Sequence, residues 1–306
     1  MEHDYLVSSE TEAAATKGVK TMPSLGDLHK RTKEIIERAR KDEEERLETG
    51  VIQLPLWRDD KRGAPNSFLR SALFAAIQSK DRCHLKEAVL GSQQGITIKY
   101  TGEQLNQEDL TIWLALVDLV RQHPLGTECS FTAYGILKHM NMDTGGQAHE
   151  KLRMSILRMT ACVLTVTNEE YTFSDRIIDR FIVDEKTKHY KITVGRHTIK
   201  LFGDNQWTAV EHKQRRSLSR KPLALALHGY YSSHEKPLPV GIEFLASITG
   251  STNSQKASFK RQVKIALEEL IKIGSLKSYE INSDVVAVNR TEKLSKRITK
   301  QSNVFE

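Results

Sequence analysis

The sequence predicts an α+β protein in which one series of helices and strands occurs twice. Apolar residues recur with helical spacing in three segments of each copy, over 106–124, 132–142 and 148–161 and again over 219–234, 241–249 and 255–274. Strand-like runs close each copy, over 162–168, 171–184 and 188–194 and again over 275–281 and 285–289. A short turn-forming segment precedes the third helix of each copy.

The order helix, helix, turn, helix and hairpin is that of a winged-helix domain, which is a helix-turn-helix followed by a β hairpin. We therefore predict two tandem winged-helix domains, over 63–210 and 211–290. The tip of the first hairpin is predicted at 185–188, EKTK. A flexible leader over 1–62 and a flexible polar tail over 291–306 are predicted on either side of the two domains.

Within the leader, residues 1–24 are polar and aperiodic, which predicts disorder. Residues 27–48 are densely charged, contain no proline and carry only a thin apolar stripe. This pattern favours a solvated helical spacer that ends near Gly50.

The charge of the chain is unevenly distributed. The net charge is +7 over 306 residues, with a pI near 9.2. Residues 1–60 hold 10 basic and 14 acidic residues, a balance of −4, so the remainder carries +11. A basic body predicts a polyanionic partner, most often nucleic acid. The absence of a signal sequence and of a long apolar run predicts a cytoplasmic protein.

The third helix of each copy has the polarity of a helix that reads DNA. Such a helix lies in the major groove, so it needs one apolar face and one polar face. In the second copy the apolar stripe comprises Phe259, Val263, Ala266, Leu267 and Leu270. Candidate DNA contacts lie outside this stripe, at Ser254, Lys256, Ser258, Lys260, Arg261 and Lys264.

In the first copy the apolar stripe comprises Ala148, Leu152, Ile156 and Met159. The residues predicted to point outward and contact DNA are Gln147, Lys151, Arg153 and Arg158. A basic cluster between the copies suits the phosphate backbone, at Arg215, Arg216, Arg220 and Lys221. A surface helix with solvated lysines would explain one basic helix, but two in matching positions favour DNA binding.

Six blocks in order along the chain resemble the TrfA family of plasmid replication initiators: NSFLRSALFAA, IKYTGEQL, PLG, SFTAYGIL, LFGDNQWT and YYSSHEKPLP. The resemblance runs from about residue 53 to residue 274. It implies a protein that binds direct repeats, called iterons, at a plasmid origin through two winged-helix domains. It also implies opening of adjacent AT-rich DNA as single strands, recruitment of the host DnaA and DnaB helicase, a monomer–dimer equilibrium and copy-number control.

Members of this family carry a Gln-Leu-x-Leu-aromatic peptide that docks on the replicative sliding clamp. The matching residues here are Gln53, Leu54, Leu56 and Trp57, where tryptophan replaces the usual phenylalanine. Pro55, a further departure, would hold the peptide extended and lower its ordering cost. The alternative is a strand that packs on the first domain.

Enzymatic chemistry has no clear signature, so we predict a non-enzyme without cofactor or metal. No phosphate-binding G-x-x-x-x-G-K-[ST] occurs, and the three cysteines are too far apart for a zinc site or a disulfide framework. A rolling-circle nickase needs two histidines one residue apart, and no histidine here has that spacing. Tyr230, Tyr231 and His234 could supply a nucleophile, but their helical spacing favours core packing.

Two DNA-binding functions therefore stay open. The main prediction is a sequence-specific initiator of theta-type plasmid replication. The alternative is a winged-helix transcriptional repressor or copy-number regulator without initiator activity, which would have no use for a clamp-binding peptide.

Overall fold

The computed structural model describes residues 32–34, 37, 54–122, 128–169, 171–203, 206–253 and 255–291. The chain forms two compact units, Met1–Thr49 and Gly50–Glu306. The described residues of the first unit, 32–34 and 37, are helical, and the rest of the helix predicted over 27–48 lies outside the described residues. Both predicted copies belong to the second unit.

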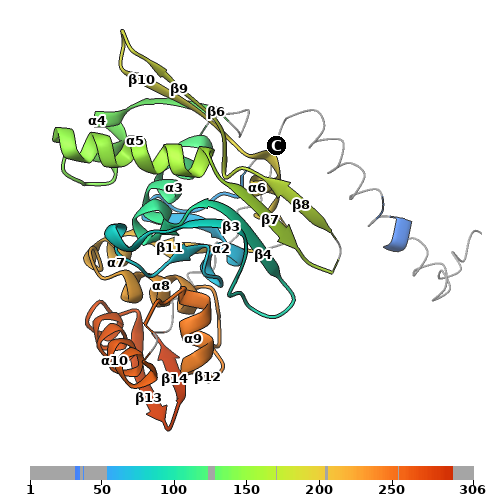
Figure 1. Cartoon of the computed structure of the whole chain (residues 1–306), viewed down its shortest axis with the longest axis vertical. Coiled ribbons are helices and arrows are strands. Elements are labelled where there is room, and N and C mark those ends of the chain that lie inside the picture. The colour runs from blue at the N-terminus through green and yellow to red at the C-terminus, as the bar shows by residue number, and fades with distance from the viewer. Residues whose placement is uncertain are drawn as a thin grey trace, which may run out of the picture. The chain divides into compact units, whose positions relative to one another are not determined.

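The second unit is a mixed α and β structure (Figure 1). Its strands are β1 (Lys61–Pro65), β2 (Phe74–Ala75), β3 (His84–Leu90), β4 (Thr97–Glu103), β5 (Leu105–Asn106), β6 (Glu128–Thr132), β7 (Val163–Thr167), β8 (Thr172–Asp175), β9 (Ile178–Asp184), β10 (His189–Val194), β11 (Trp207–Glu211), β12 (Val240–Gly241), β13 (Leu276–Asn282) and β14 (Val285–Arg290). Its helices are α2 (Asn66–Leu69), the 3-10 helix η1 (Ser79–Asp81), α3 (Gln107–Val120), α4 (Ala133–His139), α5 (Gly146–Thr160), α6 (Arg196–Lys200), α7 (His212–Ser217), α8 (Pro222–Ser232), α9 (Ile242–Thr249) and α10 (Lys256–Lys272).

Two series of elements share one topology. The first series is α3, β6, α4, α5, β9 and β10, and the second is α8, β12, α9, α10, β13 and β14. Each forms an antiparallel three-stranded sheet, in the order β6-β10-β9 and β12-β14-β13. The first hairpin turns between Asp184 and His189, which confirms the predicted tip. The internal repeat read from the sequence is therefore present as matching connectivity.

The first series contains an insertion that the sequence did not reveal. After α5 the chain forms β7, which pairs with β4, and β8, which pairs with β7, in a separate four-stranded sheet of order β3-β4-β7-β8 (Figure 1). Only then does it continue into β9 and β10. The strand-like run 162–168 therefore belongs to this second sheet rather than to the first hairpin.

Helix α3 is the central helix of the first series. A capping box begins it, in which the Asn106 side chain accepts from the Asp109 amide and the Asp109 carboxylate accepts from the Asn106 amide. Eleven of its fourteen residues are buried. Trp113 is fully buried, and its ring lies 5.0 Å from that of Phe68. A helix apolar on nearly all sides is a central helix.

Helix α8 has the equivalent place in the second series. Pro222 begins it at a position where a proline is already suited to helical backbone angles. Its buried residues pack with α9, α10 and the second hairpin in one apolar core. Gly250 ends α9 with φ of 61°, and a side-chain carbon there would lie 2.9 Å from the Cβ of Ala75. Glycine is thus required both by the left-handed turn and by close packing on β2.

Candidate nucleic-acid interface

Helix α10 has the two faces that the sequence predicted. The predicted apolar stripe from Phe259 to Leu270 is buried. Arg261 and Lys264 are exposed on the other side, and neither forms an ion pair with a residue that the structure describes. Ser258 is half-buried, and its hydroxyl accepts a hydrogen bond from Asn253 Nδ2 at 3.0 Å. Ser254 lies outside the described residues.

The lysines that begin α10 are held by acidic side chains instead of being free. Lys256 Nζ lies 2.8 Å from Asp284 in the turn of the β13–β14 hairpin and 2.8 Å from Glu243 of α9. Hydrogen bonds to Asp284 and Glu243 raise the pKa of Lys256. Lys260 donates to the Ser283 carbonyl and lies 3.4 Å from Asp284. In this structure the two lysines join α10 to the neighbouring hairpin.

Glu268 and Glu269, near the C-terminal end of α10, also have partners within the protein. Glu269 accepts from Lys221 at 2.6 Å and from Lys272 at 3.1 Å, and these hydrogen bonds lower the pKa of Glu269. Glu268 accepts from the hydroxyl of Tyr279 at 3.3 Å. The predicted phosphate contact Lys221 is thus engaged within the protein, although its side chain stays half-exposed. Exposed pairs of this kind are weak, so phosphates can compete for them.

In the first series, α5 buries its predicted apolar stripe of Ala148, Leu152, Ile156 and Met159. Gln147 and Lys151 are exposed, as predicted. Arg153 is also exposed, but it makes a bidentate contact with Glu150, with distances of 2.9 and 3.0 Å.

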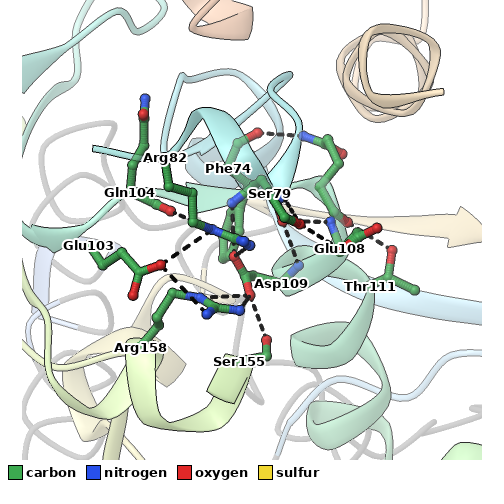
Figure 2. Close-up of polar contacts among 12 residues, drawn as sticks. Phe74, Ser79, Arg82, Glu103, Gln104, Glu108, Asp109, Thr111, Ser155 and Arg158 are labelled. Atoms are coloured by element: carbon green, nitrogen blue, oxygen red, sulfur yellow. Dashed lines mark hydrogen bonds and ion pairs between the residues drawn. The ribbon is translucent and has the colours of Figure 1, made fainter. Parts of the chain in front are cut away.

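The prediction that Arg158 points outward is wrong. Its guanidinium lies against the buried carboxylate of Asp109, with Nη2 2.9 Å from Oδ1, and only 12% of the side chain is exposed (Figure 2). Arg82 contacts Oδ2 of the same carboxylate at 2.7 Å, and Ser155 Oγ donates to Oδ1 at 2.7 Å. Helical periodicity could not reveal this, because Asp109 lies on a different helix. Arg158 instead fixes α5 onto α3.

Arg215 is a second correction. It is only 3% exposed and donates to Gln107 Oε1 at 2.9 Å, to the Gln107 carbonyl at 3.0 Å and to Thr111 Oγ1 at 3.2 Å. No acidic group pairs with it among the described residues, and burial lowers the pKa of Arg215. It therefore joins the segment before α8 to the first turn of α3 and cannot reach a phosphate. Arg216 and Arg220 of the same cluster are exposed.

The β9–β10 hairpin also presents basic residues, which the helical periodicity of the sequence does not predict. Arg180 and Lys186 are exposed and form no ion pair with any described residue. The carboxylate of Asp184 accepts from the backbone amides of Thr187 and Lys186, which lowers the pKa of Asp184 and orders the tip. The strand alternation in IDRFIVD was the signal that could have placed Arg180 on the outer face.

A family model described as TrfA protein matches residues 26–290. The chain belongs to the TrfA family. A curated relative is the plasmid replication initiator protein TrfA of Escherichia coli, which is 26% identical over 252 residues. The match covers 80% of this chain and 65% of that relative, so this TrfA-family chain spans less than two thirds of the relative's length.

Among solved structures, this TrfA-family chain is similar to two crystal structures of domains 2 and 3 of RctB. The first has a TM-score of 0.51 and 15% identity, over 71% of this chain and 87% of that one. The second has a TM-score of 0.47 and 15% identity, over 70% of this chain and 92% of that one. At 15% identity the first of these similarities describes the fold alone.

The segment that would bind a sliding clamp packs on the body of this TrfA-family protein. Leu54 and Trp57 are buried, whereas Leu56 is 78% exposed, and Gln53 lies outside the described residues. Trp57 Nε1 donates to Asp118 Oδ1 at 2.9 Å, and Arg121 lies over its ring, 5.0 Å from the centroid. The segment packs without being a strand, since β1 begins only at residue 61. Clamp binding therefore stays a prediction that requires Leu54 and Trp57 to leave these contacts.

The tyrosines weighed as nucleophiles are core residues of this TrfA-family chain. Tyr230 and Tyr231 are buried in the apolar core of the second series, which confirms the packing interpretation. His234 Nδ1 lies 2.9 Å from the Tyr230 carbonyl. No group of three potential metal ligands occurs among the residues that the structure describes. Within the same residues, no helix is long and apolar enough to cross a membrane.

Proposed function

We propose that this TrfA-family chain is a sequence-specific DNA-binding initiator of plasmid replication that binds direct repeats at the origin. The observation that carries the proposal is the outer face of α10, where Arg261 and Lys264 project without ion pairs to described residues. In a helix-turn-helix the second helix enters the major groove, and α9 and α10 have that order. Membership of the TrfA family and the similarity to a plasmid replication initiator support the initiator role.

The two series of elements are, in this proposal, two winged-helix domains. Their shared order and shared sheet topology support it, with β9–β10 and β13–β14 as the wings. In the first domain, Gln147 and Lys151 are the exposed candidates for groove and backbone contacts, with Arg180 and Lys186 on the wing.

Exposed basic residues between the two series supply phosphate contacts in this proposal, and Arg216 and Arg220 are the candidates. If the protein neutralises about six phosphates in all, the logarithm of its affinity should fall with the logarithm of salt concentration with a slope of about −5. Quantitative footprinting on repeated origin DNA at several salt concentrations measures both the site and this slope.

Substitution of Arg261 by alanine tests whether α10 recognises DNA bases. Arg261→Ala should weaken binding to the preferred sequence by about 1–3 kcal/mol and relax specificity at one position, because arginine recognises guanine edges by paired hydrogen bonds. Lys272→Ala is the matched control, since Lys272 is a cation in the last turn of the same helix. If Arg261→Ala weakens binding equally on every sequence, Arg261 contacts only phosphate and the proposed reading role fails.

Docking on a sliding clamp is a separate part of the proposal, supported by the Gln-Leu-x-Leu-aromatic pattern. Leu56→Ala tests it without disturbing the fold, whereas Trp57 is buried and unsuitable. Leu238→Ala is the control, because Leu238 is 77% exposed elsewhere on the chain. Leu56→Ala should reduce origin-dependent replication and leave DNA binding unchanged. If replication is unaffected, the clamp proposal fails and a transcriptional repressor becomes the better account.

We also propose that the chain has no catalytic activity of its own, because the tyrosines nearest to a nickase pattern are buried. Incubation with supercoiled origin DNA and a divalent cation should leave the DNA intact, and metal-dependent nicking would refute this. Recruitment of DnaA and DnaB, opening of AT-rich DNA, dimerisation, copy-number control and a cytoplasmic location on plasmid DNA stay predictions from the family resemblance and the composition.

A further inference from the structure

Ile265 is the most exposed large apolar residue of α10. Its side chain is 56% exposed, although it is in the third turn of a well-packed helix. A lone exposed aliphatic side chain is ordinary on a protein surface, so its exposure alone decides nothing. Its position among the neighbouring side chains is the informative feature.

Ile265 belongs to the stripe that points away from the core. Ser258, Arg261, Gln262 and Ile265 follow the spacing i, i+3, i+4 and i+7, which aligns them on one face of a helix. Arg261, Gln262 and Ile265 are exposed. The side chain of Ile265 therefore projects in nearly the same direction as the guanidinium that is expected to read a base.

Most of the charged residues that flank the stripe are held by partners within the protein, whereas Lys264 is exposed without an ion pair to a described residue. On one side Lys256 and Lys260 contact Asp284 of the β13–β14 turn. On the other side Glu269 is bound by Lys221 and Lys272. The stripe itself presents a cation, an amide and an aliphatic side chain, and the Glu268 carboxylate that follows it is half-buried and accepts from the Tyr279 hydroxyl.

Each base pair in the major groove offers a different set of groups, and the 5-methyl group of thymine is the apolar one. An aliphatic side chain cannot hydrogen-bond to a base or to a phosphate, so a methyl group is the feature it can recognise there. We propose that Ile265 is a specificity-determining residue that contacts a thymine methyl group when α10 enters the major groove. This inference rests on the proposed function, and it adds an apolar contact to the polar readout by Arg261.

The helix geometry also predicts where this thymine lies. Ile265 lies four positions after Arg261, a rise of about 6 Å along the helix axis. Successive base pairs are about 3.4 Å apart. The thymine should therefore lie within about two base pairs of the position at which Arg261→Ala relaxes specificity.

The experiment begins by selecting preferred duplexes from a random-sequence library with the full chain. In the selected duplex each thymine is then replaced in turn by deoxyuridine, which lacks only the methyl group. Affinities are measured by fluorescence anisotropy for the unsubstituted chain, Ile265→Ala and Ile271→Ala. Ile271 is the matched control because it is an exposed isoleucine of the same helix, outside the stripe. Thermal unfolding followed by circular dichroism verifies that both variants are folded.

One thymine should lie near the base pair at which Arg261→Ala relaxes specificity. Replacing this thymine by deoxyuridine should lower the affinity of the unsubstituted chain and of Ile271→Ala about fourfold, as expected for burial of one methyl-sized group. Ile265→Ala should bind the thymine and deoxyuridine duplexes equally. If Ile265→Ala keeps the same thymine preference as the unsubstituted chain at every position, the inference is overturned while sequence-specific binding still stands. If the full chain selects no sequence from the library, the proposed function fails and this inference fails with it.

Discussion

Asp109→Ala should destabilise the second unit strongly. The carboxylate is fully buried and accepts from Arg82 and Arg158, whose side chains are 8% and 12% exposed, and from Ser155 (Figure 2). It also accepts from the backbone amide of Asn106 in the α3 capping box. Among the described residues, its removal leaves Glu103 as the one acidic partner of the two guanidinium groups, 3.7 Å from Arg158 and 3.9 Å from Arg82. Loss of one partner from a buried ion pair costs about 3–5 kcal/mol.

Urea unfolding followed by far-UV circular dichroism measures this loss. Glu108→Ala is the control, because Glu108 is the adjacent acid in the same first turn but is exposed. The control should change the free energy of unfolding by less than about 1 kcal/mol. In the Asp109→Ala background, Arg158→Met should restore part of the lost stability by removing one uncompensated charge. A loss below about 1 kcal/mol for Asp109→Ala would refute the idea that this carboxylate fixes α5 onto α3.

Three further outcomes follow from buried polar groups. Arg215→Met should lower the free energy of unfolding by about 1–3 kcal/mol, because the side chain of Gln107 loses its donor. The slope of the logarithm of DNA affinity against the logarithm of salt concentration should stay unchanged. A slope smaller by about one would show that Arg215 contacts a phosphate. Burial lowers the pKa of His212, so as the pH drops below about 6.5 the unfolded chain binds a proton before the folded chain does, and the free energy of unfolding should fall. Urea unfolding of His212→Gln at several pH values should show a smaller decrease. An unchanged decrease would exclude His212 as its source. Trp57→Phe removes the indole donor to Asp118 and should cost about 1 kcal/mol in urea unfolding, whereas an unchanged midpoint would show that this hydrogen bond contributes nothing.

The sequence predicted those features that depend on local periodicity. The apolar stripes of α5 and α10, the hairpin tip at 185–188 and the burial of Tyr230 all follow from spacing within one element. These features need no knowledge of which elements meet in space.

The sequence could not predict the features that depend on long-range contacts. Arg158 has the spacing of an outward residue, but a carboxylate 49 positions away draws it inward. Arg215 occurs in a basic run, yet its partner Gln107 is 108 positions away. The strand pairing of β4 with β7 likewise joins segments on either side of α3, α4 and α5.

The pairing of β4 with β7 has a consequence for the order in which the chain can fold during synthesis. Strand β4 is made before α3, α4 and α5, but its partner β7 appears only after all three. Until then one edge of β4 has no strand to pair with, and such an edge is prone to join another chain. Pairing β4 with β7 also closes a long loop of chain, which is a slow step in folding. Truncations or fusions that separate residues 97–103 from 163–167 should therefore aggregate, whereas a break before β3 should be tolerated better.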